Sequence, residues 1–93
     1  MSQMDRPDIY VLSRFLEALW TKGMGQMRRQ DLQMAVGVNY NIFNKYLAFL
    51  FAKGLAVEDD EGGERMVKIT ARGVDALKML VDLMSQVFEN KKL

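Results

Sequence analysis

A polar cluster near the middle of the chain carries the side chains best suited to chemistry. Amides and a lysine follow a turn, and two arginines stand about ten residues earlier. Asparagine can bind adenine through two hydrogen bonds, while lysine and tyrosine can contact phosphates or guanine edges. The residues concerned are Asn39, Tyr40, Asn41, Asn44 and Lys45, with Arg28 and Arg29 before them. Their types and spacing alone do not assign them to a nucleic acid.

Each of these residues also has a simpler interpretation. Asn39 precedes an apolar helical pattern, where an asparagine commonly caps the first turn. The others could be solvated surface groups. Arg28 and Arg29 fall at the expected start of a short helix, and a helix N-terminus favours phosphate. For this pair, phosphate binding and simple solvation remain open alternatives.

Catalysis and metal binding have little support in the composition. The chain has no Cys and no His, and its serines are Ser2, Ser13 and Ser85. A nucleophile with its base and orienting group cannot be assembled in the common ways. The acidic run from Glu58 to Glu64 lacks the spacing of a calcium loop. We therefore predict a non-enzyme with no catalytic residues, no metal site and no cofactor.

The elements that must hold the cluster can be read from apolar spacing. A first helix is predicted over Pro7–Lys22, started by Asp5, Pro7 and Asp8 and ended by Gly23. Residues 24–27 form a connector or a short edge strand. A second helix covers Arg28–Val36, and a third follows Asn39 to Lys53, with Gly54 as its C-terminal cap. The turn between these helices contains Gly37.

A hairpin and a long helix complete the predicted order. Strands at residues 55–58 and 66–69 flank the turn signal Asp60–Gly63. Thr70 is expected to cap a last helix over residues 71–90. One seam of this helix alternates steps of three and four residues, which is a heptad pattern. Its members are Val74, Leu77, Val81, Met84 and Phe88. We predict that this seam pairs two copies of the chain.

The bulk composition is consistent with one small domain. The chain has 93 residues, 49% of them hydrophobic, which is more apolar surface than a core this small readily covers. No run approaches the roughly 20 apolar residues of a membrane span, and residues 1–7 lack the order of a signal peptide. A cytoplasmic location is expected. Residues 1–54 carry seven Lys/Arg against four Asp/Glu, whereas residues 55–93 carry six against eight.

The segments Asn44-Lys45-Tyr46-Leu47, Lys53-Gly54-Leu55 and Ile69-Thr70 with Gly73 resemble archaeal winged-helix DNA-binding proteins. The resemblance covers nearly the whole chain. It implies a mainly α fold with a small β-hairpin (α+β), a winged helix-turn-helix whose third helix reads DNA. It divides the chain into a short tail (1–6), the winged helix (7–70) and a dimerisation helix (71–93) within one structural unit.

Two departures separate the chain from that pattern. The wing is acidic, with Arg65 and Lys68 as its only cations, whereas a phosphate-binding wing is usually basic. The third helix ends in the apolar stretch Ala48–Ala52. These features keep two alternatives open, a protein-interaction module of a larger complex and an architectural chromatin protein.

The first interpretation is a homodimeric regulator of transcription that binds double-stranded DNA with residues 39–53 in the major groove. In this interpretation Arg28 and Arg29 hold phosphates, and the final helices pair. The sequence identifies no small-molecule effector, no DNA site and no direction of regulation.

Overall fold

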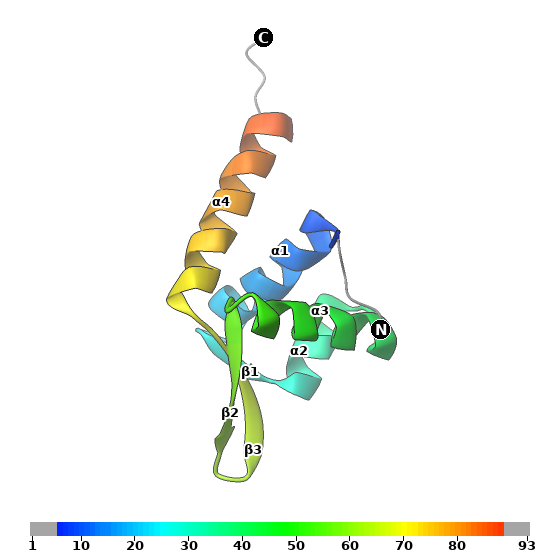
Figure 1. Ribbon diagram of the computed structural model, residues 1–93, viewed down its shortest axis with the longest axis vertical. Coiled ribbons are helices and arrows are strands. Elements are labelled where there is room, and N and C mark those ends of the chain that lie inside the picture. Colours follow the sequence, from blue (N-terminus) through cyan, green and yellow to red (C-terminus); the bar gives the residue numbers. More distant parts are fainter. Residues whose placement is uncertain (1–5, 89–93) are drawn as a thin grey trace.

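The computed structural model describes residues 6–88. It contains eight elements in the order α1 (Ile9–Glu17), η1 (Ala18–Lys22), β1 (Gln26–Arg28), α2 (Arg29–Val36), α3 (Tyr40–Ala52), β2 (Ala56–Glu61), β3 (Glu64–Ile69) and α4 (Ala71–Phe88). Helices α1, α2 and α3 form the body, the β2–β3 hairpin projects from one end, and α4 projects from the other (Figure 1). The predicted order of helices and wing is confirmed.

The first helix differs from the single helix predicted over Pro7–Lys22. The Asp8 carboxylate accepts a hydrogen bond from the Tyr10 N–H at 2.8 Å, so α1 begins at Ile9. From Ala18 the chain widens into the π-helical segment η1, and the Gly23 N–H returns to the Ala18 carbonyl at 2.9 Å. Apolar spacing does not distinguish a π-turn from an α-turn, because both keep Leu19 on the core side.

The sheet has three strands rather than the two of the expected hairpin. Its order is β1-β3-β2, with both pairs antiparallel and Arg28 opposite Met66. The edge strand considered for residues 24–27 is therefore present, shifted to Gln26–Arg28. The hairpin strands extend beyond their predicted ends, because Gly62 and Gly63 alone make the turn. Both have positive φ, 60° and 87°, as the tight hairpin turn requires.

The core fills the space between the three body helices and the sheet. The ring of Phe15 on α1 lies 5.5 Å from the rings of Phe43 and Tyr46 on α3. Leu32 of α2 and Val67 of β3 complete this core and are fully buried. The rigid body formed in this way fixes how α2 and α3 are presented to solvent.

Helix α4 joins this body at its first turn. The Thr70 hydroxyl accepts a hydrogen bond from the Gly73 N–H at 3.0 Å and donates one to the Gly54 carbonyl at 2.7 Å, so the predicted cap is present. Gly73 is buried, and a Cβ there would lie 2.1 Å from the Leu55 carbonyl oxygen. The helix was predicted to reach residue 90, and residues 89–90 lie outside the described part. Among the helices described over residues 6–88, none has an apolar stretch that would span a bilayer.

Candidate nucleic-acid interface

The exposed face of α3 is set by its buried face. Phe43, Tyr46, Leu47 and Leu50 lie in the core. Because successive residues of an α-helix are about 100° apart, the opposite face carries Asn41, Lys45, Ala48 and Ala52. All four are exposed. We call these residues the α3 stripe. It offers an amide and a cation at one end, and two methyl groups at the other.

The apolar end of α3 therefore differs from what the sequence indicated. Phe49 and Phe51 are half-buried and pack against the core, one on each flank of the helix. The Lys53 ammonium lies 5.8 Å from the centre of the Phe49 ring. The residues that face solvent are small alanines, which allow a close approach to the helix backbone. Ala48 and Ala52 were missed as surface residues, although their spacing from Asn41 and Lys45 could have revealed them.

The start of α3 has one residue engaged in capping and one exposed ring. The Asn39 side-chain oxygen accepts a hydrogen bond from the Ile42 N–H at 2.9 Å, as expected of an N-cap. Tyr40 is 65% exposed. Among the residues the structure describes, the Lys45 side chain makes no ion pair or hydrogen bond. Lys45 is therefore a cation available to an anionic ligand.

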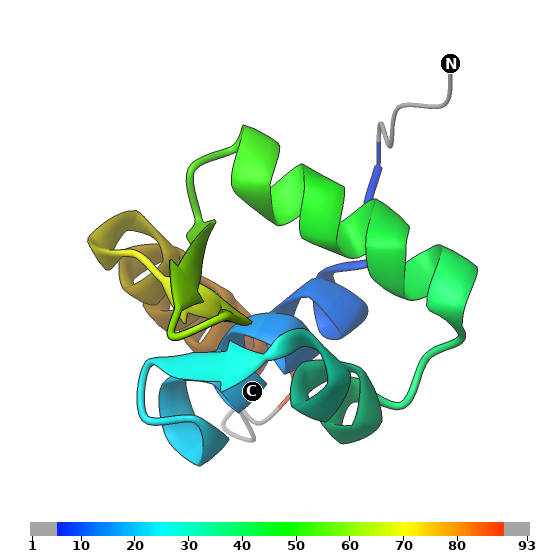
Figure 2. The same ribbon diagram turned by 90° about the horizontal axis from the view of Figure 1, so that it is seen from below.

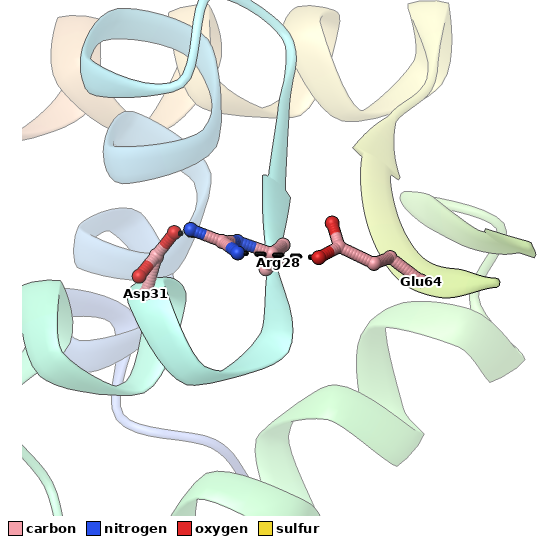
Figure 3. Close-up of polar contacts among 3 residues, drawn as sticks. All are labelled: Arg28, Asp31 and Glu64. Atoms are coloured by element: carbon pink, nitrogen blue, oxygen red, sulfur yellow. Dashed lines mark hydrogen bonds and ion pairs between the residues drawn. The ribbon is translucent and has the colours of Figure 1, made fainter. Parts of the chain in front are cut away.

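Arg28 has a different environment, between two acidic side chains. It ends β1, and its guanidinium contacts Asp31 of α2 at 3.2 Å and Glu64 of β3 at 3.3 Å (Figure 3). The hydrogen bond to Asp31, with the charges of Asp31 and Glu64, raises the pKa of Arg28 above its usual value. Its side chain is 55% exposed, so phosphate could reach it only in competition with these carboxylates.

Arg29 lies deeper, at the junction of α2, α3 and the wing. One guanidinium nitrogen contacts Glu58 of β2 at 3.0 Å, and the other donates to the Asn44 side-chain oxygen at 3.1 Å. Asn44 is thereby separated from the α3 stripe and turned toward Arg29. No local sequence pattern indicates this arrangement, because Glu58 is far from Arg29 in the chain.

Most acidic side chains of the wing contact a cation of the same chain. The Lys68 ammonium lies 3.0 Å from an oxygen of Asp59 and 2.6 Å from an oxygen of Glu61, and its hydrogen bond lowers the pKa of Asp59. Glu58 and Glu64 contact the two arginines already described. Across residues 6–88, no three acidic side chains are grouped so as to hold a metal ion.

The predicted dimerisation seam is divided by the chain's own packing. Leu77 is buried in the core, whereas Val81 is 50% and Phe88 64% exposed. The Phe88 ring lies 5.9 Å from that of Tyr10 on α1. A shallow groove of about 430 Å³ between η1 and α4 is lined by Trp20, Leu77 and Val81, with Glu17, Lys78 and Asp82 at its polar positions. The other flank of α4 exposes Met79, Leu83 and Val87.

Seen from the wing end of the molecule, α2 and α3 lie beside the hairpin (Figure 2).

No protein-family model matches the chain, and no curated protein matches it in sequence. Solved structures do match. F93 from STIV, a winged-helix DNA-binding protein, has a TM-score of 0.79 at 10% identity over 89% of this chain and 96% of its own.

Two further structures resemble the chain over a similar share of this sequence, one of them over less of its own length. Sso10a-2, a DNA-binding protein from Sulfolobus solfataricus, has a TM-score of 0.69 at 16% identity, covering 90% of this chain and 87% of its own. The transcriptional regulator BldR from the same organism has a TM-score of 0.69 at 18% identity, covering 89% and 63%. The chain thus has the winged-helix fold that its sequence motifs predicted.

Proposed function

We propose that the protein binds double-stranded DNA as a homodimer and regulates transcription, with α3 in the major groove. The observation that carries the proposal is the α3 stripe, an exposed helix face backed by the core, with Asn41 and with Lys45, which forms no ion pair within residues 6–88. An amide and an ammonium are groups that bind base edges and phosphates. The fold supports the proposal, since F93 and Sso10a-2 are described as DNA-binding proteins.

The small residues of the stripe also favour a groove. The major groove is about 12 Å wide and admits an α-helix most closely where its side chains are short. Ala48 and Ala52 meet that condition, and a methyl group can contact the methyl of thymine. The apolar end of α3, which had favoured a protein partner, is accounted for by Phe49 and Phe51 packing inward.

Pairing through α4 is the second part of the proposal. The helix has 18 residues; one side of it lies along η1 and α1, and its C-terminal turns project beyond the body helices (Figure 1). Its exposed apolar side chains lie on two flanks, one with Val81 and Phe88 and the other with Met79, Leu83 and Val87. A second copy covering either flank would bury them, and two-fold symmetry would match a pseudo-palindromic DNA site.

Selection of bound sites from a library of random duplexes tests whether the protein binds DNA with sequence specificity. The wild type should select a pseudo-palindromic site. Asn41→Ala should relax the preference at one base pair per half-site, since a good base contact contributes about 1–3 kcal/mol of discrimination. Gln30→Ala, an exposed amide on α2, is the matched control and should select the wild-type site.

Two results would contradict the proposal. If Asn41→Ala selects the wild-type site unchanged, the stripe does not read bases. If the wild type selects no site and binds no duplex at low salt, the protein-interaction alternative replaces DNA binding. Sequence-independent binding alone would favour an architectural protein.

A further inference from the structure

The contact that joins the wing to α3 passes through Arg29. Glu58 of β2 holds one side of the guanidinium, and Asn44 of α3 holds the other. The Arg29 and Glu58 side chains are 34% and 26% exposed, against 55% and 56% for Arg28 and Glu64. Since screening by water and salt weakens exposed pairs most, the Arg29–Glu58 pair is the more firmly held of the two.

The same contact fixes the orientation of Asn44. A guanidinium has only donors, so the Asn44 atom that faces Arg29 must be its oxygen. The amide nitrogen then points away from Arg29. Bidentate binding of adenine needs both the amide oxygen and the amide nitrogen. While Arg29 stays in place, Asn44 is less able to make that pair of bonds.

We propose that Glu58 is a specificity-determining residue, which holds Arg29 against Asn44 and withholds both from DNA of the wrong sequence. The inference rests on the proposed DNA binding. Non-specific DNA offers Arg29 a phosphate in exchange for the Glu58 carboxylate, one anion for another. A specific site offers in addition a base edge to Asn44, which is released when Arg29 moves. Glu58 therefore lowers non-specific affinity more than specific affinity.

The wing supplies a matched control for its negative charge. Asp60 is exposed, lies on the same strand as Glu58, and makes no ion pair among the described residues. Glu58→Gln and Asp60→Asn each remove one negative charge from β2 and keep the side-chain size. Only Glu58→Gln releases Arg29. A difference between the two variants therefore measures the contact rather than the general repulsion of DNA by the wing.

The experiment measures binding of a labelled 20-base-pair duplex of random sequence, and of the selected site, between about 50 and 300 mM KCl. Glu58→Gln should bind the random duplex about three- to fivefold more tightly than Asp60→Asn does, the range expected for loss of a partly exposed ion pair. Its plot of log affinity against log salt should be steeper by about one unit, because Arg29 gains a phosphate without losing a carboxylate. The ratio of specific to non-specific affinity should fall.

A double variant isolates the role of Arg29. In the Arg29→Ala background, Glu58→Gln should give no more gain than Asp60→Asn. Thermal denaturation of each variant establishes that it is folded under the binding conditions. A gain that persists without Arg29 would overturn the inference and leave Glu58 as a repulsive charge.

The outcomes separate this inference from the proposed function. If the wild type binds and selects a site but Glu58→Gln behaves as Asp60→Asn, the inference fails and DNA binding stands. If the wild type binds without selecting a site, DNA binding stands and a specificity role for Glu58 is overturned. If neither the wild type nor any variant binds a duplex at 50 mM KCl, both proposals fail.

Discussion

The wing and the far end of α4 project from opposite ends of the molecule (Figure 1). They differ in whether their side chains find partners within the chain. On the wing, Glu58, Asp59, Glu61 and Glu64 each contact an arginine or lysine of the same chain. On α4, the apolar side chains Met79, Val81, Leu83, Val87 and Phe88 are 49–72% exposed. At one end most of the acidic side chains are paired, whereas at the other the apolar side chains stay exposed among residues 6–88.

This difference follows from the two kinds of element. Cross-strand neighbours on a hairpin lie about 5 Å apart, so opposite charges can meet within the ribbon itself. A single helix turns its side chains away from its own axis and can cover only the flank that another element contacts. Lys68 thus offsets two carboxylates within the hairpin, whereas the pairing proposed for α4 would cover its exposed apolar side chains.

The largest effect is expected at the joint that carries α4. Gly73→Ala would place a methyl group 2.1 Å from the Leu55 carbonyl oxygen, so backbone would have to move. We expect a loss of about 3 kcal/mol or more in the free energy of unfolding, larger than the roughly 1 kcal/mol that alanine gains by its helix propensity. Urea denaturation measures the change. Asp75→Ala, an exposed control on the same helix, should change little, and equal midpoints for both variants would contradict the packing argument.

The next effect concerns the open surface of α4. Val81→Glu and Leu83→Glu place a charge on its two flanks, and the variant on the dimer face should be monomeric. Removing one buried valine-sized side chain from each copy costs about 3 kcal/mol, or more than a hundredfold in the dimer dissociation constant. Light scattering at ~100 µM distinguishes dimer from monomer, since that concentration exceeds useful affinities.

Gln86→Glu adds the same charge at a position that is already polar, and it should remain dimeric. A monomeric wild type would end the pairing proposal. If Leu83→Glu alone dissociates the protein, the contact lies on the flank that the heptad seam left out. In that case the heptad seam of α4 would pack on α1 of the same chain, and the dimer contact would lie on the other flank of α4.

A smaller effect distinguishes paired from unpaired cations in DNA binding. Lys45→Ala should lower the salt slope by about 0.9, the value for one lost phosphate contact. Arg28→Ala should lower the salt slope by less, because the Arg28 guanidinium already forms ion pairs with Asp31 and Glu64. Fluorescence anisotropy on a random duplex from 50 to 300 mM salt gives both slopes. Equal reductions would mean that the carboxylates release Arg28 readily.

The smallest effect is a dependence of stability on acid pH. Lys68 lowers the pKa of Asp59 below its ordinary value of 3.8, so the charged form is favoured in the folded state. The resulting stabilisation is complete above pH 3.8 and is lost as the pH falls through the lowered pKa. Asp59→Asn should therefore lose less thermal stability than the wild type on acidification from pH 5 to pH 3. Asp60→Asn is the control, and identical losses for Asp59→Asn and the wild type would contradict the pairing.

Local patterns predicted the elements of this fold well, because each signal lies within a few residues. Asn39 caps α3, and Thr70 caps α4, as their positions before apolar periodicity indicated. The strand β1 was harder to predict, since a three-residue edge strand depends on β3 for its pairing. The π-helical turn of η1 leaves the apolar spacing unchanged and could not be inferred from it.

The candidate site was predictable only in part, for a related reason. The exposed face of α3 follows from helix geometry, so Asn41 and Lys45 were placed correctly on the surface. The partner of Arg29 depends on where the wing packs against α2, which no local pattern encodes. Sequence reasoning could therefore suggest Asn44 as a base reader, but it could not detect the hydrogen bond that joins Asn44 to Arg29.

The strand order β1-β3-β2 has a consequence for the time course of folding. β2 and β3 are adjacent in the chain and can pair early, but α2, α3 and β2 separate β1 from β3. Pairing β1 closes a long loop, which costs chain entropy before its contacts form and slows folding relative to a bundle of local contacts. Trp20, the one tryptophan of the sequence, lies in η1 shortly before β1. Because Trp20 lines the groove between η1 and α4, its fluorescence reports the packing of α4 on η1, a step whose rate can be compared with that of strand pairing.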